Sequence, residues 1–270
     1  MKGMASNTAF DRGRGISVGS VFGRSFDVIR SNPVATLGTS FLVMALPQLL
    51  FGLIGTGTTF ANTPRLGLYV TAGLGGLVIG VLWLVASGAL VHATIAHDRG
   101  RKADLAEVLR VGATRALPLF AVYLLFTIGV SIGTLLLFVP GVMLAVMWSV
   151  ALPAIVAERT GVYGAFGRSR ALTKGARWPV FGIMLLAVVI YTLASATVGV
   201  ASIAGNGTYA AIASGARVAA PRLPLLAQLL QAAVSTVVLT WFTTVGTSLF
   251  VELRHWKDGP DADRLADIFA

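Results

Sequence analysis

Residues of the types that most often do chemistry are few and scattered in this chain. His92 and His97 lie near the end of an apolar stretch, and Asp98 follows, so two imidazoles and a carboxylate could in principle hold a divalent metal. Residues five apart do not share a helix face, however, as an i, i+4 pair would. The chain also has no cysteine. The sequence therefore predicts no metal site and no cofactor.

Hydrolytic chemistry would need a nucleophile beside a base, or a pair of carboxylates. The acidic residues are instead dispersed along the chain. Glu158 with Arg168 or Arg170 could form one charged cluster, and Glu252 with Arg254 another. Such clusters also balance charge where helices meet lipid headgroups. We therefore predict that the protein is not an enzyme.

Hydroxyl groups recur at helical spacing near the end of the chain. Thr236, Thr240, Thr244 and Ser248 could line a polar path for a solute. Threonines at this spacing more often bond to their own helix or to a neighbouring one. The path through Thr240, Thr244 and Ser248 would support an alternative function, a passive conduit or a lipid-handling transport protein.

Small residues recur at a spacing that lets helix backbones approach closely in lipid. Three such motifs are present: Gly76-x3-Gly80, Gly129-x3-Gly133 and Ser195-x3-Gly199. They could form a face for a homo-oligomer, or they could pack helices within one chain.

Six long apolar stretches must position all of these residues. Hydrophobic residues make up 56% of the chain and charged residues 12%, against about 25% charged in soluble domains. A helix needs about 20 apolar residues to cross the hydrocarbon layer, and most of the stretches supply them. We predict an all-α polytopic membrane bundle with spans at 34–56, 66–96, 117–138, 142–157, 179–204 and 223–251.

Basic residues alternate between the segments that separate these spans. From the first segment to the last, the Lys and Arg counts are 5, 1, 5, 0, 5, 2 and 3, which account for all 21. All 11 acidic residues lie in the basic segments. This is the positive-inside pattern of a protein with both ends in the cytoplasm. It explains the net charge of +10 without nucleic-acid binding.

Each basic segment that leads into a span contains a short amphipathic stretch followed by a proline, at Pro33, Pro118 and Pro179. Such stretches are typical of helices that lie in the membrane interface. The tetrapeptide Phe22-Gly23-Arg24-Ser25 recurs as Phe166-Gly167-Arg168-Ser169. We therefore predict three units, each an interfacial helix followed by a helical hairpin. In the first unit the predicted apolar face contains Val18, Phe22, Phe26 and Ile29.

The middle hairpin has almost no connection. Val139-Pro140-Gly141 must reverse the chain inside the membrane or at its edge, since Pro and Gly favour turns. The fourth span is short and contains Pro153, which predicts a kink.

The residues from Pro140 to Gly175 resemble a known family. Pro140-Gly141, Trp148, Pro153, Glu158, Ala165, Arg168-Ser169 and Leu172-Thr173-Lys174-Gly175 are similar to the membrane domain associated with bacterial glycerophosphoryl diester phosphodiesterases. The stretch Val251-Glu252-Leu253-Arg254 is similar to the way those domains end. The resemblance implies six spans. In that family a separate soluble barrel carries the activity, through a His-Arg-Gly motif. The nearest string here, His97-Asp98-Arg99-Gly100, is interrupted by Asp98, so no catalytic residue is carried over.

We expect a single membrane domain over residues 1–270, in three parts: a cytoplasmic segment at 1–33, the bundle at 34–251 and a cytoplasmic tail at 252–270. The expected location is a bacterial inner membrane. The predicted function is that of a scaffold or accessory subunit, possessing a basic cytoplasmic face that binds anionic lipid or a partner. Its predicted contacts are Arg24, Arg168, Arg170 and Lys174. Membrane lipids, a second copy of the chain or a larger membrane complex are the expected partners.

Overall fold

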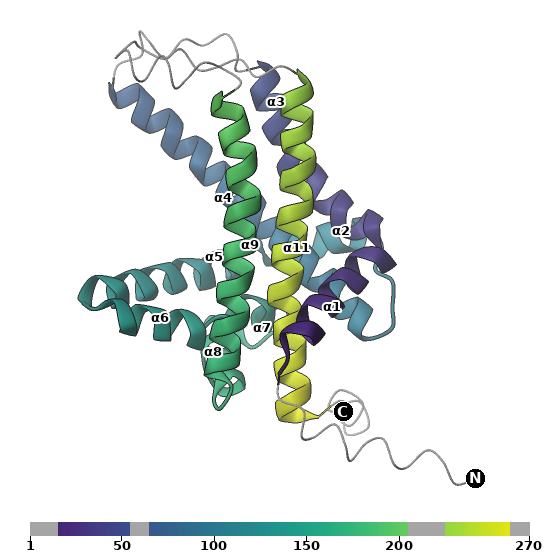
Figure 1. Ribbon diagram of the computed structural model, residues 1–270, viewed down its shortest axis with the longest axis vertical. Helices are drawn as coiled ribbons and strands as arrows, with labels where there is room; N and C mark the ends of the chain where they lie inside the picture. The colour runs from purple at the N-terminus through teal and green to yellow at the C-terminus, as the bar shows by residue number, and fades with distance from the viewer. Residues whose placement is uncertain (1–15, 55–64, 205–224, 260–270) are drawn as a thin grey trace.

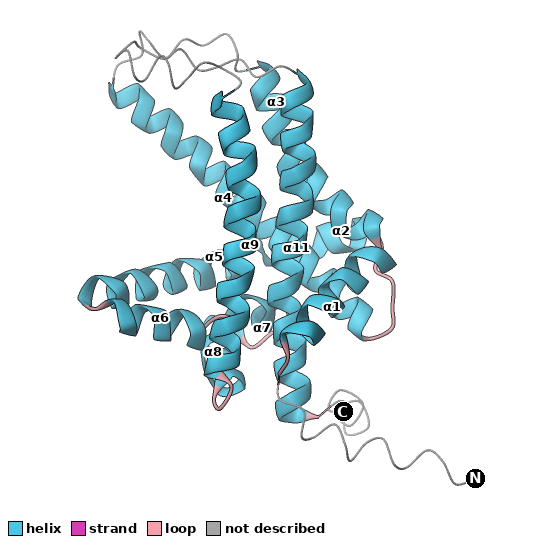
Figure 2. Cartoon of the chain, in the orientation of Figure 1, coloured by secondary structure: helices cyan, strands magenta, loops and turns pink. Residues whose placement is uncertain are grey.

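The protein is helical throughout the part of the chain that the structure describes. A computed structural model describes residues 16–54, 65–204 and 225–259. Within these ranges the secondary structure is helix joined by short connections, without strands (Figures 1 and 2). Six of the helical segments are long and apolar enough to cross a membrane. The predicted fold class, an all-α polytopic membrane protein, is confirmed.

The first helix, α1 (Val18–Ser31), ends where the sequence predicts. Asn32 separates it from α2 (Pro33–Ser40): its backbone N–H donates to the Val28 carbonyl, and its side-chain oxygen accepts from the Ala35 N–H at 3.3 Å. Pro33 occupies the first position of α2, where a missing N–H removes no helical bond. One asparagine therefore caps both helices.

The packing of α1 differs from the predicted apolar face. Its buried residues are Val21, Ser25 and Val28, whereas Val18 and Phe26 are exposed. The helix lies against α11 (Leu225–Asp258). Phe22 and Ile29 of the predicted face are partly buried and pack against the core.

The first apolar segment contains one irregular turn. A π-helix, η2 (Phe41–Ala45), separates α2 from α3 (Leu46–Ile54). Pro47 follows it directly. A proline ring inside a helix clashes with the carbonyl four residues earlier, here Val43, and a widened turn relieves that clash.

Helices α4 (Arg65–Asp98) and α5 (Leu105–Leu136) pack closely through glycine. A Cβ added to Gly112 would collide with the Val85 carbonyl oxygen and lie 3.0 Å from the Ala89 nitrogen. Pro118 lies inside α5 and does not begin a new helix. The second predicted interfacial helix and the third span therefore form one continuous helix.

Helix α5 and helix α6 (Phe138–Met147) form a hairpin that reverses at Leu137. Leu137 has extended backbone angles (φ −160°, ψ 137°), and Pro140 and Gly141 lie in the first turns of α6. The motif Gly129-x3-Gly133 packs inside this hairpin, because a Cβ at Gly133 would lie 3.1 Å from the Gly141 Cα.

The predicted kink in the fourth span lies before Pro153. Helix α6 ends at Met147, and α7 (Ala151–Glu158) begins after the turn Trp148–Val150. Pro153 therefore lies in the first turn of α7, where helices tolerate proline.

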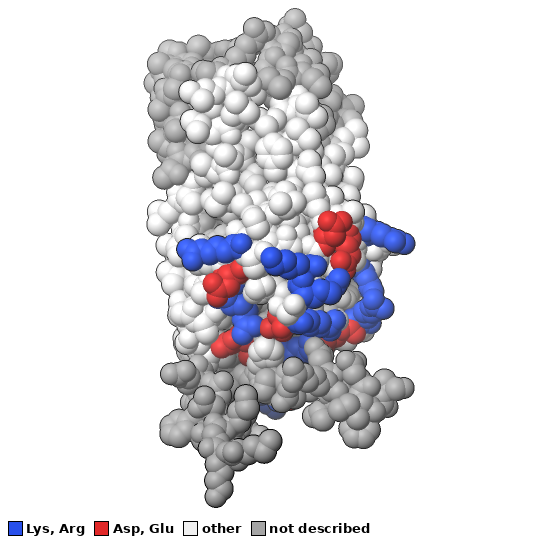
Figure 3. Space-filling model, turned by 90° about the vertical axis from the view of Figure 1, so that its right-hand side faces the viewer, with Lys and Arg blue, Asp and Glu red and all other residues white. Residues whose placement is uncertain are grey.

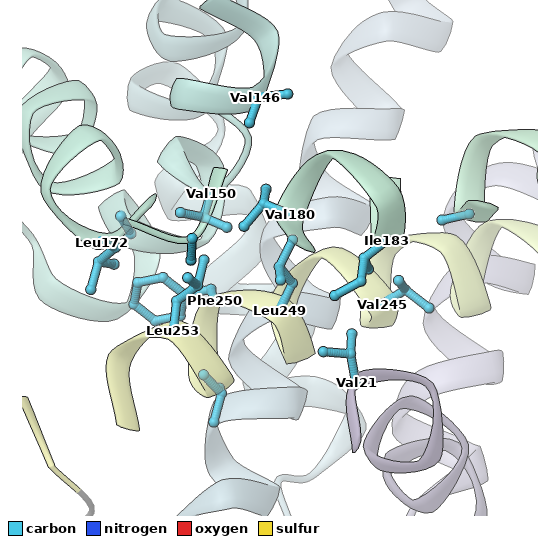
Figure 4. Close-up of a cluster of buried hydrophobic side chains, with 14 of the residues drawn as sticks. Val21, Val146, Val150, Leu172, Val180, Ile183, Val245, Leu249, Phe250 and Leu253 are labelled. Atoms are coloured by element: carbon cyan, nitrogen blue, oxygen red, sulfur yellow. The ribbon is translucent and has the colours of Figure 1, made fainter. Parts of the chain in front are cut away.

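Helices α8 (Gly161–Thr173), α9 (Arg177–Ala204) and α11 complete the bundle. Their largest shared core contains Val146, Val180, Ile183 and Phe250, together with Leu172 of α8 (Figure 4). Because α11 supplies Val245, Leu249, Phe250 and Leu253 to this core, it is the central helix of the structure.

Charge is concentrated at one end of the bundle. On the face that Figure 3 shows, charged side chains form a band across the lower half, and the described surface above it shows no charged side chain. We call this the charged end: there α9 begins at Arg177 and α11 ends at Asp258. In Figure 1, α9 and α11 follow the long axis, whereas α5 and α6 run across it.

We predict that Gly112→Ala destabilises the protein, because the new methyl group must push α4 and α5 apart. Such overpacking typically costs about 1–3 kcal/mol. Thermal unfolding of the detergent-purified protein measures the change. Gly80→Ala is the matched control, since a Cβ at Gly80 meets nothing within 4 Å. Equal melting temperatures for the two variants would contradict the close packing of α4 and α5.

Candidate functional site

The four basic residues predicted as contacts separate into two pairs. Arg24 and Arg168 are partly buried, with 27% and 25% of their side chains exposed. Arg170 and Lys174 are exposed. The first pair makes ion pairs within the chain, and the second pair makes none with the residues that the structure describes, so the two pairs have different physical roles.

Arg24 joins α1 to the ends of two other helices. Its Nη1 lies 2.5 Å from Oδ1 of Asp98 at the end of α4, and its Nη2 lies 3.3 Å from Oε2 of Glu252 on α11. Ser20 donates to Oε1 of Glu252 at 2.9 Å, and His255 Nε2 lies 3.4 Å from Oδ2 of Asp98. We call these five residues the Arg24 cluster.

Arg168 makes an equivalent connection from α8. Its Nε lies 3.0 and 2.7 Å from the two carboxylate oxygens of Glu158, at the end of α7, and its Nη2 contacts Asp258 on α11. Arg254 Nε lies 3.7 Å from Glu158. We call these four residues the Arg168 cluster. Burial opposes the charge of Arg168, but the hydrogen bonds to Asp258 and Glu158 outweigh it and raise the pKa of Arg168.

The repeated tetrapeptide has equivalent surroundings in both places. Each arginine binds one carboxylate at the end of the neighbouring helix and one on α11. Each phenylalanine packs on a tryptophan: Phe22 on Trp241 with ring centroids 5.4 Å apart, and Phe166 on Trp148 at 4.9 Å. The two tetrapeptides therefore share their contacts as well as their sequence.

Ser169 of the second tetrapeptide closes the break between α6 and α7. Its hydroxyl donates to the Met147 carbonyl at 2.9 Å and accepts from the Val150 N–H at 3.3 Å. Thr173 also lies 3.4 Å from the Met147 carbonyl. These bonds satisfy backbone groups that the break removes from the helical pattern, which matters where water is scarce.

An exposed basic and aromatic surface lies beside the Arg168 cluster along the chain. Tyr163 and Arg170 share one face of α8, because they are seven residues apart, and Lys174 follows at the C-cap of the helix. Arg177 and Trp178 begin α9 three residues later. Tyr163 is 85% exposed and Trp178 is 83% exposed. We call these five residues the basic-aromatic patch.

The basic groups of this patch differ from Arg24 and Arg168 in their pairing. Among the described residues, no carboxylate lies within ion-pair distance of Arg170, Lys174 or Arg177. Sequence reasoning missed Tyr163, Arg177 and Trp178 as candidates. The signal was Arg177-Trp178 directly before an apolar helix, since basic and aromatic residues both favour the membrane interface.

The hydroxyls of the predicted polar path are buried and largely engaged. Thr240 donates to the Thr236 carbonyl and lies 2.7 Å from the Ser40 hydroxyl of α2, and Thr244 donates to the Thr240 carbonyl at 2.9 Å. Ser248 is buried without a hydrogen-bond partner in the described residues. This placement favours helix packing, and the conduit stays a prediction.

A pocket of about 420 Å³ lies elsewhere, between the first apolar segment and α4. Its lining is apolar apart from Gln48 and includes Met44, Leu74 and Gly75. Gly76 and Gly80 of the predicted packing motif meet no neighbour within 4 Å. The surroundings of Gly199, in the third motif, are outside what the structure describes.

The two histidines near the end of the predicted second span have separate neighbours. His92 Nε2 lies 2.9 Å from Glu107 of α5, and His97 Nδ1 lies 3.0 Å from the Ser31 hydroxyl. Among the described residues, no three His, Asp or Glu side chains are grouped as metal ligands would be.

The fold and the charged end define a multi-pass, all-α membrane protein. The family model for the membrane domain of glycerophosphoryl diester phosphodiesterase matches residues 115–265, more than half of the chain. The chain therefore belongs to this family, as the residues between Pro140 and Gly175 suggest. The matched region contains the Arg168 cluster and the basic-aromatic patch. No curated protein and no solved structure matches the chain significantly.

We predict that Arg168→Ala destabilises the protein, because Glu158 and Asp258 then lose their main partner. Hydrogen bonds to charged groups typically contribute about 1.5–3 kcal/mol. Arg170→Ala, two residues away on the exposed side, removes the same charge and should change stability by less than about 0.5 kcal/mol. Thermal unfolding in detergent compares the two variants. If Arg170→Ala lowers the melting temperature as much, the Arg168 cluster is not the cause.

Proposed function

We propose that the protein is a non-enzymatic membrane scaffold and that its basic-aromatic patch binds anionic lipid headgroups. One observation carries the proposal: three basic side chains without an ion-pair partner among the described residues lie close in sequence to two strongly exposed aromatic rings, where α8 leads into α9. The positive-inside pattern supports placing the charged end in the cytoplasm of a bacterial cell, in the leaflet that is rich in anionic lipid.

The chemistry of the patch suits a headgroup layer. A Lys or Arg near an anionic membrane surface contributes about 1 kcal/mol. Arg170, Lys174 and Arg177 together would then favour anionic lipid by about 3 kcal/mol, roughly a hundredfold. Tyr163 and Trp178 can place their rings at the headgroup boundary, where such side chains are enriched.

Arg24 and Arg168 have a different part in this proposal. Both are already bound to carboxylates of the same chain. They hold α1 and α8 against α11. In this way Arg168 fixes α8, the helix that carries Tyr163 and Arg170 of the patch. The function as an accessory subunit is consistent with the family, whose model describes a membrane part and not a catalytic one.

We predict that the triple variant Arg170→Ala, Lys174→Ala, Arg177→Ala loses its enrichment of anionic lipid. The measurement is mass spectrometry of the lipid retained after reconstitution into nanodiscs of phosphatidylethanolamine and phosphatidylglycerol. Enrichment of phosphatidylglycerol should fall at least tenfold, because the variant lacks the three cationic side chains that would bind its phosphate.

A matched triple variant serves as the control. Arg30→Ala, Lys102→Ala and Arg110→Ala remove the same total charge from exposed positions outside the patch. This variant should keep most of the enrichment. An equal loss in both variants would mean that lipid responds to net charge alone. Unchanged enrichment in both, with a changed set of proteins cross-linked in native membranes, would favour a protein partner instead.

A further inference from the structure

The α5–α6 hairpin is a closely packed unit that leaves the bundle sideways. Gly129 packs directly on the Trp148 ring, with 2.5 Å between an added Cβ and the nearest ring atom, and Gly133 packs on Gly141 and Leu144. Figure 1 shows the two helices side by side, running across α9 and α11. They lie in the lower half of that view. Figure 3 is turned about the same vertical axis, so its charged band lies in the same half.

The tip of the hairpin is made entirely of exposed apolar residues. Leu135, Leu136, Leu137, Phe138 and Val139 are between 66% and 87% exposed. No Asp, Glu, Lys or Arg lies between Arg115 and Glu158. Turns that emerge into water normally contain polar residues, as the predicted connection from Gly57 to Arg65 does. Five apolar side chains exposed to water would be unfavourable, because removing apolar surface from water lowers the free energy.

The length of α6 also limits how far the tip can reach. Ten residues extend about 15 Å at a helical rise of 1.5 Å, half of the roughly 30 Å hydrocarbon layer. The base of α6 is anchored near the charged end, because Val146 packs in one core with Val180 and Ile183, in the first two turns of α9 (Figure 4). From that base, α6 cannot carry the tip to the opposite membrane surface.

We infer that the α5–α6 hairpin inserts into the leaflet at the charged end without crossing the membrane, and that its tip contacts the acyl chains of that leaflet. The remaining long segments, α2 to α3, α4, α9 and α11, cross the bilayer. An even number of crossings leaves the two ends of the chain on one side. This arrangement agrees with the alternation of basic segments as well as a six-span arrangement does, because the turn between α5 and α6 contains no Lys or Arg. The inference does not depend on lipid binding by the basic-aromatic patch.

The absence of cysteine makes a direct test possible, since each introduced thiol is unique. Leu136→Cys and Val139→Cys place a thiol at the tip. Lys102→Cys marks the charged end, and Thr58→Cys marks the predicted connection on the opposite side. Each variant is treated with a membrane-impermeant maleimide in sealed vesicles of both orientations, and then with a permeant fluorescent maleimide.

The tip thiols should resist the impermeant reagent from both sides, whereas Lys102→Cys and Thr58→Cys should each react from one side. A fluorophore at the tip should then be quenched by lipids that carry a doxyl group on the acyl chain. Labelling of the tip from the Thr58 side would show a transmembrane hairpin and overturn the inference. Labelling from the Lys102 side would place the hairpin outside the bilayer. Protection without doxyl quenching would show that protein covers the tip.

Discussion

The arrangement of this protein depends on the ion pairs at the charged end of α11. Within about two turns, that helix presents Glu252 and His255 to the Arg24 cluster, and Arg254 and Asp258 to the Arg168 cluster. Arg24 and Arg168 each also bind a carboxylate at the end of a neighbouring helix. The two clusters therefore connect α1, α4, α7 and α8 to one central helix. Partly buried charges are costly unless they are paired and hydrogen-bonded. The pairing therefore specifies how these helices are placed more than it adds raw stability.

Local patterns in the sequence were sufficient to predict the helices. Apolar length and the alternation of charge are properties of neighbouring residues, and Pro33 and Pro179 mark the beginnings of α2 and α9 as expected. The ion-pair partners could not be predicted in the same way, since Arg24 and Glu252 are 228 residues apart. The repeated tetrapeptide drew attention to both arginines. Their exposure, which separates them from Arg170 and Lys174, follows from packing that no local pattern encodes.

Sequence reasoning misplaced one helix break and predicted another that the structure does not have, and both errors have one physical cause. A helix can be interrupted in a membrane protein only where other groups satisfy its freed backbone. At Trp148–Val150 the satisfying hydroxyl comes from Ser169 on another helix, so Pro153 indicates a break nearby but not its position. At Pro118 the opposite holds: the proline suggests a break, yet α5 continues through it. Tertiary contacts decide both cases.

The position of α11 along the chain has a consequence for biosynthesis. Helix α11 follows every other described helix, so Glu252 and Asp258 are made after the arginines that they bind. Until α11 enters the membrane, Arg24 and Arg168 each lack one carboxylate, and the shared core lacks Leu249 and Phe250. While α11 is still inside the ribosome, α1 and α8 are therefore held by only part of their contacts. These helices reach their final packing only after α11 has been made.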